Sequence, residues 1–298
     1  MRFYTRYIHT FVRITRTEIF FVTLGKKIPF FLKFIPLPTD YSVSENRIVC
    51  RDHTFFHLRL HDYMQWHIFA QQSDISWRIA LQQLTESACV LDIGANCGAF
   101  SLKLAQAAIR NKISNCVIYA FEPNPVVCQY FDRNLSLNPK ILPAVHLQRI
   151  GLGDKNEKLQ IVFSEKNTGG GRIIKNRQGT GFSVEIQTLD SFAQMHNLKN
   201  IVFIKIDVEG FEPLVLEGAM KTIEYHKPVI FVEITDSWFK ERNSSEDFFV
   251  NYFLNEGYKL WMEVDNQIMK YSPLEAKKMW QYNLLAMPDR LTSVKHRK

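Results

Sequence analysis

The sequence lacks the patterns that mark disulfide-rich secreted proteins and membrane-spanning proteins. Its five cysteines form no CxxC pair and no Cys/His spacing typical of a metal site. We therefore expect reduced thiols, as in a cytosolic protein, and no disulfide framework. No uninterrupted apolar stretch approaches the roughly 20 residues that a spanning helix needs. Charges interrupt each apolar run near the N-terminus, which argues against a cleavable signal peptide.

Acidic residues are scarce at the start of the chain. Within residues 1–40, Glu18 and Asp40 oppose a larger basic set, namely Arg2, Arg6, Arg13, Arg16, Lys26, Lys27 and Lys33. This segment therefore carries most of the net charge of +7, and the nearly balanced remainder argues against a nucleic-acid channel. The segment is also rich in Phe and Tyr, and two interpretations stay open. It is a helical extension whose aromatic stripe packs on the main domain or a second subunit, or an interfacial helix on anionic lipid.

The rest of the chain divides into two parts. Pro29, Pro36 and Pro38 end the basic aromatic extension 1–40. Residues 41–86 mix short strand-like runs with a helix expected at 63–84, and we expect them to form a cap or lid over the mouth of a site. Their histidines lack the HExxH pattern or paired carboxylate that would complete a metal site. From 87 to 290 strands and helices alternate, which predicts one α/β domain.

A strand, a glycine turn and a helix open this domain at residues 89–110. The run C-V-L-D-I is apolar around the single Asp92, which is typical of a strand buried on both faces. Gly94 and Gly98 then let backbone N–H groups approach a ligand, with a helix N-terminus behind them. Such a unit is typical of nucleotide-binding α/β domains.

The spacing of the glycines indicates which kind of nucleotide. A dinucleotide fold holds its pyrophosphate with G-x-G-x-x-G, and here the middle glycine is absent. Some ligands have an amino-acid tail and a ribose but no phosphates. Such a ligand does not require the backbone to approach as closely at that point. The next strand, expected at 116–121, is followed by Glu122, which is placed to accept both ribose hydroxyls.

Three stretches together carry a resemblance to a known family. The runs V-L-D-I-G-A-N-C-G-A-F, Y-A-F-E-P-N-P and I-K-I-D-V-E-G-F-E resemble the FkbM family of S-adenosylmethionine-dependent methyltransferases. The resemblance implies an α/β class I methyltransferase fold with a Rossmann-like, seven-stranded, mostly parallel sheet and an N-terminal helical or cap extension. It also implies S-adenosyl-L-methionine as cofactor and O-methylation of a hydroxyl on a sugar, glycan or glycolipid.

The elements expected beyond residue 122 fit that fold. We expect helices at 125–137, 211–225, 246–256 and 274–280, and strands at 145–150, 158–163, 182–188, 201–206, 228–234, 258–264 and 282–287. The strands 158–163 and 182–188 alternate like a hairpin. The glycine-containing stretch between them, 167–181, is expected to be a mobile substrate loop or a plain connector.

The cofactor-binding residues are expected in the loops that follow the first three strands. The predicted set is Asp92, Gly94, Asn96, Gly98, Phe100, Glu122, Asn124 and Asp154. For Asp154 two roles stay open: it accepts a hydrogen bond from the adenine amino group, or it stabilises the turn beside Gly153.

The catalytic candidates are Asp207, Glu209 and Glu233, at the ends of two later strands. In an open parallel sheet, ligands bind beyond the carboxyl ends of the strands, so these acids are expected at the same crevice as Gly94 and Glu122. Three roles stay open for them: general base, ligands of a divalent cation, or a cap on the helix near residue 211. A metal requirement is left unknown.

Two motifs of nucleic-acid methyltransferases are absent after the strand 201–206. Asp-Val-Glu-Gly stands where adenine-N6 enzymes carry N/D-P-P-Y/F and cytosine-C5 enzymes carry Pro-Cys. We therefore expect a small-molecule or glycan acceptor and no nucleic acid, with peripheral membrane contact through 1–40 and a homo-oligomer left open. The expected location is cytoplasmic, with the inner membrane surface as an alternative. The alternatives in function are a membrane-associated cofactor-binding protein without turnover, and a methyltransferase acting on nucleic acid or protein.

Overall fold

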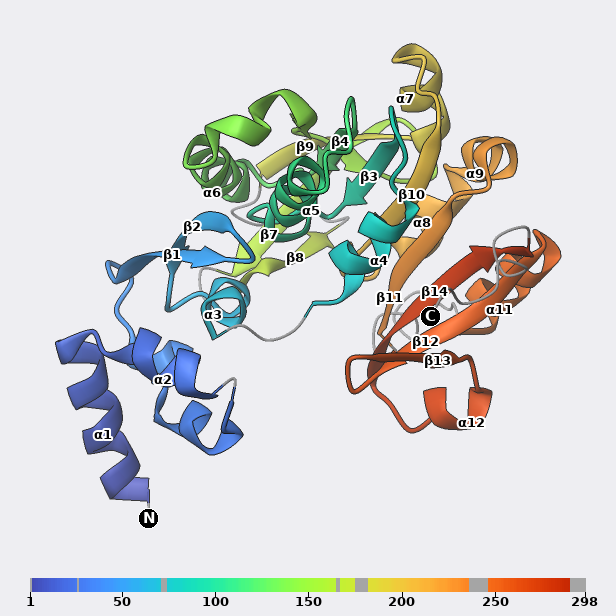
Figure 1. Cartoon of the computed structure of the whole chain (residues 1–298). Coiled ribbons are helices and arrows are strands. Elements are labelled where there is room, and N and C mark those ends of the chain that lie inside the picture. The colour runs from blue at the N-terminus through green and yellow to red at the C-terminus, as the bar shows by residue number, and fades with distance from the viewer. Residues whose placement is uncertain are drawn as a thin grey trace. The chain divides into compact units, whose positions relative to one another are not determined.

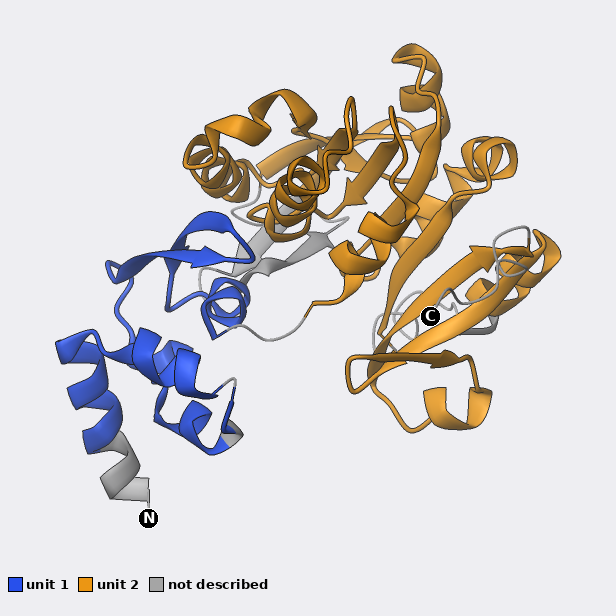
Figure 2. Cartoon of the chain, viewed as in Figure 1, with its two compact units in different colours: residues 1–73, 163–171 blue, residues 74–162, 172–298 orange. Residues whose placement is uncertain are grey.

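The computed structural model describes residues 2–25, 27–70, 74–164, 167–174, 182–235 and 246–289. The chain forms two compact units (Figure 2). Unit 1 comprises 1–73 and 163–171, and unit 2 comprises 74–162 and 172–298. The boundary at 73/74 falls inside the segment 41–86, whose role as a lid stays a prediction.

Unit 1 joins the N-terminal helices to a β-hairpin. Its elements are α1 (Arg2–Thr15), α2 (Glu18–Gly25), the 3-10 helices η1 (Pro29–Phe34) and η2 (Pro38–Asp40), the strands β1 (Asn46–Arg51) and β2 (Thr54–Arg59), and α3 (Tyr63–Ala70). Distant parts of this unit are tied by polar contacts. Arg47 Nη2 donates to Glu18 Oε1 at 2.6 Å, and Trp66 Nε1 donates to the Pro36 carbonyl at 2.8 Å.

Unit 2 is built on an eight-stranded sheet in the order β13-β12-β14-β11-β10-β3-β4-β5 (Figure 1). The strands are β3 (Cys89–Ile93), β4 (Val117–Phe121), β5 (Val145–Gln148), β10 (Ile201–Ile206), β11 (Val229–Thr235), β12 (Tyr258–Val264), β13 (Gln267–Lys270) and β14 (Gln281–Pro288). The strands β5, β4, β3, β10 and β11 run parallel, and β14 runs antiparallel to β11 and to β12. Chain order reverses between β3 and β10, which is where open parallel sheets bind ligands.

Helices and most of a smaller sheet complete unit 2, since the parts of that sheet within 163–171 belong to unit 1. The helices are α4 (Ser76–Gln83), α5 (Ala99–Arg110), α6 (Pro125–Ser136), α7 (Leu189–Met195), α8 (Glu212–Glu217), α9 (Met220–His226), α11 (Glu246–Asn255) and α12 (Pro273–Ala276), with the 3-10 helix η3 (Pro139–Ala144). The smaller sheet has the order β6-β9-β7-β8, with β6 (Gly151–Leu152), β7 (Glu157–Ser164), β8 (Asn167–Ile174) and β9 (Phe182–Gln187). The expected hairpin is confirmed, since β7 pairs antiparallel with β9.

The core lies along the central strands. All five residues of β3 are buried, as the apolar run predicts. Leu91, Ile204 and Val232 on three adjacent strands have no exposed surface. Each such side chain stabilises the fold by roughly 1.5–3 kcal/mol relative to an exposed one, so the strands that carry the site are held rigidly. The class I methyltransferase arrangement is present, with a large and mostly parallel sheet.

Several expected elements differ from the structure. An eighth strand, β13, pairs with β12. The helix expected at 211–225 is divided into α8 and α9, because a Cβ at Gly218 would lie 1.9 Å from the Gly153 carbonyl oxygen, so the two backbones meet there. The helix expected at 274–280 is reduced to α12, and the one expected at 63–84 is divided into α3 and α4. Within the expected loop 167–181, residues 167–174 form β8, and 175–181 lie outside the described residues.

Candidate functional site

The glycine turn after β3 packs directly on the segment after β10. Gly94 has φ +84°, and a Cβ added there would lie 1.8 Å from the Asp207 carbonyl oxygen. Asp207 N in turn donates to the Ile93 carbonyl at 2.9 Å. Gly98 also has a positive φ, +91°. Glycine is therefore required for the left-handed backbone and for the close approach of two loops, which brings Asp207 to the end of β3.

The N–H groups of this turn are all used inside the protein. Gly94 N and Ala95 N donate to the Phe121 carbonyl, and Gly98 N donates to the Ala95 carbonyl. Asn96 N donates to Glu122 Oε2, and Cys97 N donates to the Asn96 side chain. The expectation that glycines expose these N–H groups to a ligand is therefore wrong. Among the carbonyl oxygens of the turn, that of Ala95 accepts from Gly98 N, that of Gly98 accepts from Leu102 N, and that of Cys97 accepts from Asn134 Nδ2. The acceptors that the turn offers a ligand are therefore the carbonyl oxygens of Gly94 and Asn96, beside the neighbouring carboxylates.

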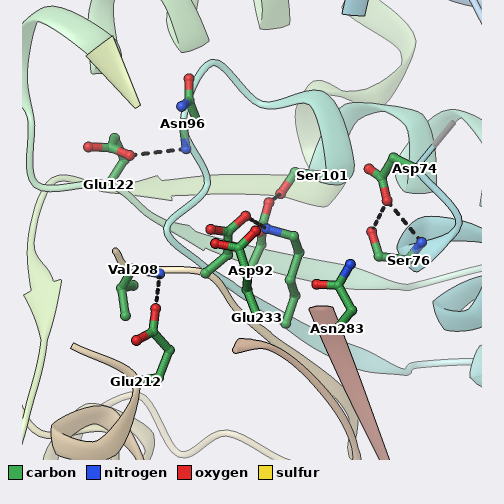
Figure 3. A network of polar contacts seen from close by, with 12 residues as sticks. Asp74, Ser76, Asp92, Asn96, Ser101, Glu122, Val208, Glu212, Glu233 and Asn283 are labelled. Atoms are coloured by element: carbon green, nitrogen blue, oxygen red, sulfur yellow. Dashed lines mark hydrogen bonds and ion pairs between the residues drawn. The ribbon is translucent and has the colours of Figure 1, made fainter. Parts of the chain in front are cut away.

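Glu122 follows β4 and is bonded to the glycine turn. Its Oε2 accepts from Asn96 N at 3.0 Å (Figure 3), and its Oε1 accepts from Asn124 N at 2.9 Å. A carboxylate has about four acceptor positions, so two remain for further donors such as hydroxyls. Burial raises the pKa of Glu122 to about 7, although the two backbone N–H groups act in the opposite direction.

Lys205 lies among the acids at the ends of β3 and β10. Its Nζ donates to Asp207 Oδ2 at 2.8 Å, and it is in register with Asp92 on the neighbouring strand. Burial alone would lower the Lys205 pKa, but the charges of Asp207 and Asp92 raise it above the ordinary lysine value. From the sequence alone, Lys205 stands two residues before Asp207 and close to the buried middle of its strand, which predicts that it points away from the crevice. The ion pair with Asp207 shows that this prediction is wrong.

Asp92 is completely buried beneath this cluster. Ser101 Oγ donates to its Oδ2 at 2.6 Å (Figure 3), and its Oδ1 has no hydrogen-bond partner. Burial raises the pKa of Asp92 to about 6, and the charge of Lys205 opposes that rise. The Asp92 carboxyl group therefore interacts with Lys205 through its charge. Its role in cofactor binding stays a prediction.

The three catalytic candidates influence one another electrostatically. Burial, followed by the charges of Asp207 and Glu209, raises the pKa of Glu233 to about 9. Burial and the Asp207 charge raise the pKa of Glu209 to about 7. Gln281 Nε2 on β14 donates to Glu233 Oε1. The acids therefore form one cluster in which neighbouring groups hold different protonation states near neutral pH.

Glu212 is a residue that the sequence reasoning missed. Its carboxylate is buried and accepts from Val208 N at 3.0 Å and from Gly210 N at 3.2 Å. It therefore fixes the loop that carries Asp207 and Glu209. The signal was present, because Glu at the start of a helix often bonds back to N–H groups just before it. The capping role left open for Asp207 and Glu209 stays a prediction, and the residue at the N-cap of α8 is Phe211, whose side chain makes no capping hydrogen bond.

Three other predicted cofactor residues have structural partners. Phe100 is buried and stacks on Phe203, with ring centroids 5.9 Å apart. Asn124 caps α6, since its Oδ1 accepts from Val126 N at 2.9 Å. Asn96 adopts a left-handed backbone, and its Oδ1 accepts from Cys97 N. These contacts shape the two loops around Glu122.

Asp154 is the remaining residue of the predicted cofactor-binding set. Asp154 is exposed and follows β6, where it is open to solvent. In the part of the chain that the structure describes, no group of three or more His, Cys, Asp or Glu side chains is arranged to hold a metal ion.

The charge of the crevice favours one kind of ligand. Asp92, Glu122, Asp207, Glu209 and Glu233 lie around the carboxyl ends of the central strands, with Lys205 as their cation in the described residues. Carboxylates repel the phosphates of a dinucleotide and attract positive groups and hydroxyl donors. The residues present therefore fit a ligand with a ribose and positive charge.

Two methyltransferases are similar to this chain in sequence. The chain is similar to Methyltransferase 1 of Beauveria bassiana (strain ARSEF 2860), with 29% identity over 149 residues that cover 43% of this chain and 57% of that protein. It is similar to Methyltransferase sdnD of Sordaria araneosa, with 24% identity over 188 residues that cover 53% of this chain and 69% of that protein.

A solved structure and a family model were also matched. The crystal structure of Methyltransferase FkbM from Methylobacillus flagellatus KT is 16% identical, with a TM-score of 0.47, over 76% of this chain and 52% of that one. The present chain thus spans little more than half the length of that protein and of Methyltransferase 1. The model of the methyltransferase FkbM domain matches residues 92–260, more than half of the 298 residues. The chain therefore belongs to the FkbM family, and its central domain is a methyltransferase domain.

Proposed function

We propose that the protein is an S-adenosylmethionine-dependent O-methyltransferase that methylates a hydroxyl of a sugar, glycan or glycolipid. The observation that carries the proposal is the gathering of Asp207, Glu209 and Glu233 beside the glycine turn and Glu122, at the reversal of strand order. A sugar hydroxyl is weakly acidic, so its methylation gains from a base within reach. Three clustered carboxyl groups supply one.

The residues around the turn fit the proposed cofactor. In this proposal the two remaining acceptor positions of Glu122 take the ribose hydroxyls, and the exposed Asp154 accepts from the adenine amino group. In this proposal the carbonyl oxygens of Gly94 and Asn96 accept from the ammonium group, since the N–H groups of the turn are already bonded within the protein. The bound cofactor supplies a methyl group activated on a positively charged sulfur, which the acidic crevice attracts.

Among the three acids, Glu209 is the best candidate for the base. Lys205 holds Asp207, and Gln281 bonds to Glu233, whereas no described hydrogen bond ties the Glu209 carboxyl. A base is most effective when its pKa lies near the working pH, and that of Glu209 is raised to about 7 by burial and by Asp207. In this scheme Glu209 removes the hydroxyl proton while Asp207 and Lys205 keep the acceptor oxygen in line.

A labelled-methyl transfer screen tests the proposal. The full chain is incubated with labelled cofactor and with extracts separated into glycan, lipid, protein and nucleic-acid fractions. We expect label in the glycan or glycolipid fraction, and we expect Glu209→Gln to bind cofactor normally while losing about 10²- to 10⁴-fold in rate. Label confined to protein or nucleic acid overturns the acceptor class. Cofactor binding with no transfer to any fraction favours a binding protein without turnover.

Two further measurements separate the roles left open for the acids. A fully active Glu209→Gln with an inactive Asp207→Asn moves the base to Asp207. Activity that survives exhaustive chelation excludes a catalytic cation held by these carboxylates. Activity that is lost on chelation and restored by a divalent ion establishes such a cation.

A further inference from the structure

The N-terminal part of unit 1 exposes an apolar stripe. On α1, Tyr7, Phe11 and Ile14 are 72%, 65% and 71% exposed. Their spacing of four and three residues places them on one side of the helix. On α2 and η1, Phe20 and Phe30 are 62% and 56% exposed. Single exposed apolar residues are ordinary, whereas several on one side of one helix favour an interaction surface.

The stripe is not the inner face of the unit. The opposite side of α1 is already packed, since Val12 and His9 are buried. His9 Nδ1 lies 3.0 Å from Asp40 Oδ2, and its Nε2 lies 2.9 Å from the Lys33 carbonyl oxygen. Arg13 Nη1 also donates to the Asp40 carbonyl oxygen. The helix is thus fixed within unit 1 by its buried side, with the aromatic side turned outward.

The charges around the stripe are of one sign. Both acids within residues 1–40 are engaged inside the unit: the Glu18 side chain is fully buried against Arg47, and Asp40 is bonded to His9 and to Leu37 N. Arg16, Lys27 and Lys33 are exposed. The remaining surface charge of this described stretch is therefore basic.

We propose that this aromatic-basic face, made of Tyr7, Phe11, Ile14, Phe20 and Phe30 with Arg16, Lys27 and Lys33, binds an anionic lipid surface. Aromatic rings with flanking basic residues are what an interfacial helix presents to acyl chains and to anionic head groups. Lys33 Nζ lies 3.2 Å from the Phe30 ring centroid, so charge and ring occur side by side.

The charge argues against a second copy as the occupant, because two faces with a basic surplus repel each other. The helix α1 has 14 residues, whereas a spanning helix needs about 20. Within the described ranges, no helix is both long and apolar enough to cross a bilayer. The face therefore lies on the lipid surface. The inference does not depend on the proposed function.

Vesicle sedimentation with the full chain tests the inference. We expect binding to vesicles of phosphatidylcholine with phosphatidylserine, little binding to phosphatidylcholine alone, and weaker binding as salt is raised. Replacing Arg16, Lys27 and Lys33 by Gln should lower the partition coefficient roughly fivefold for each charge removed. Phe11→Ser with Phe20→Ser should lower it at least tenfold, because each buried ring contributes strongly.

Matched variants in unit 2 serve as controls. Tyr225→Ser and Trp280→Ser remove side chains that are 84% and 74% exposed, and Lys199→Gln with Lys270→Gln removes two exposed charges. These variants should bind vesicles as the unchanged protein does, and all variants should keep their unfolding midpoints. Equal loss in the control variants, or no binding of the unchanged chain to anionic vesicles, overturns the inference. Self-association that Phe11→Ser abolishes, without vesicle binding, assigns the face to a second copy.

Discussion

Lys205 Nζ and Asp207 Oδ2 lie 2.8 Å apart, with side chains that are 13% and 28% exposed. The two residues stand two positions apart at the end of β10, so an extended backbone points both side chains to one side of the sheet. Asp92 lies in register with Lys205 on β3. The Lys205 ammonium group thus interacts with Asp207, which follows β10, and with Asp92 on β3. The electrostatics at this edge of the sheet depend on it.

Removing this ammonium should destabilise the protein in a pH-dependent way. Lys205→Met leaves Asp207 and Asp92 without their cation. Because the pair with Asp207 is only partly buried, we expect a cost of about 1–3 kcal/mol, between that of a surface pair and that of a buried one. The loss in the free energy of unfolding, measured by urea titration, should be larger at pH 8 than at pH 6, because Asp92, whose pKa burial raises to about 6, is more often protonated at the lower pH. Lys278→Met breaks an exposed pair with Glu275 and should cost no more than about 1 kcal/mol. Equal losses would contradict the role given to Lys205.

Two glycines with similar backbones allow the close contact of the loops to be tested. Gly94 has φ +84° and faces the Asp207 carbonyl, whereas Gly257 has φ +76° with nothing within 4 Å of an added Cβ. Gly257→Ala should cost about 1–2 kcal/mol from backbone strain alone. Gly94→Ala should cost about 1–3 kcal/mol more, because the Cβ forces the loops apart. Thermal unfolding measures both costs. If Gly94→Ala costs no more than Gly257→Ala, the two loops can move apart without a loss of stability.

Glu212 is expected to matter through the loop that it holds. Glu212→Ala leaves Val208 N and Gly210 N without their acceptor and should cost about 1–3 kcal/mol in the free energy of unfolding. Glu217→Ala removes an exposed carboxylate from the same helix and should stay within about 0.5 kcal/mol. Glu212→Gln keeps one acceptor oxygen. If it lowers the free energy of unfolding as much as Glu212→Ala does, loss of the two hydrogen bonds is not the cause of the destabilisation.

The raised pKa values predict a protein that is less stable in base. Burial and the charges of Asp207 and Glu209 raise the pKa of Glu233 in the folded state to about 9 from its ordinary value of 4.5. Between these pH values the folded state therefore holds a proton that the unfolded state has released. Stability therefore falls as pH rises through this window, by at most about 1.4 kcal/mol per pH unit for one proton. Thermal midpoints from pH 5 to pH 9 should decline less in Glu233→Gln. Glu185→Gln, a substitution at an exposed position, should leave the dependence of the thermal midpoint on pH unchanged.

The elements that sequence patterns predicted well are those fixed by local chemistry. The strands β3 and β10 are apolar except for Asp92 and Lys205, a pattern typical of strands buried on both faces. The helix α6 starts at Pro125 after Asn124, whose side chain accepts from the first helical N–H groups, and both residue types are typical of that position. Glu122 and the acids after β10 were placed correctly because parallel strands end at one edge of the sheet.

The features that were missed depend on tertiary contacts. The position of Lys205 is decided by Asp92 on another strand and by the turn that orients Asp207. The break at Gly218 comes from the backbone of Gly153, which is 65 residues away by numbering. The strand β13 is exposed at every position, so it carries no apolar alternation for a pattern to detect.

The central claim is that Glu122 and the glycine turn hold one S-adenosylmethionine molecule. Calorimetric titration of the unchanged chain and of Glu122→Ala with this cofactor tests it most directly, with Glu185→Ala as a control for an exposed carboxylate. The account predicts one saturable site in the unchanged chain and in the control, weakened by about 1.5–3 kcal/mol in Glu122→Ala, which loses a charged hydrogen-bond acceptor. Absence of binding, or equal affinity in Glu122→Ala, would contradict it.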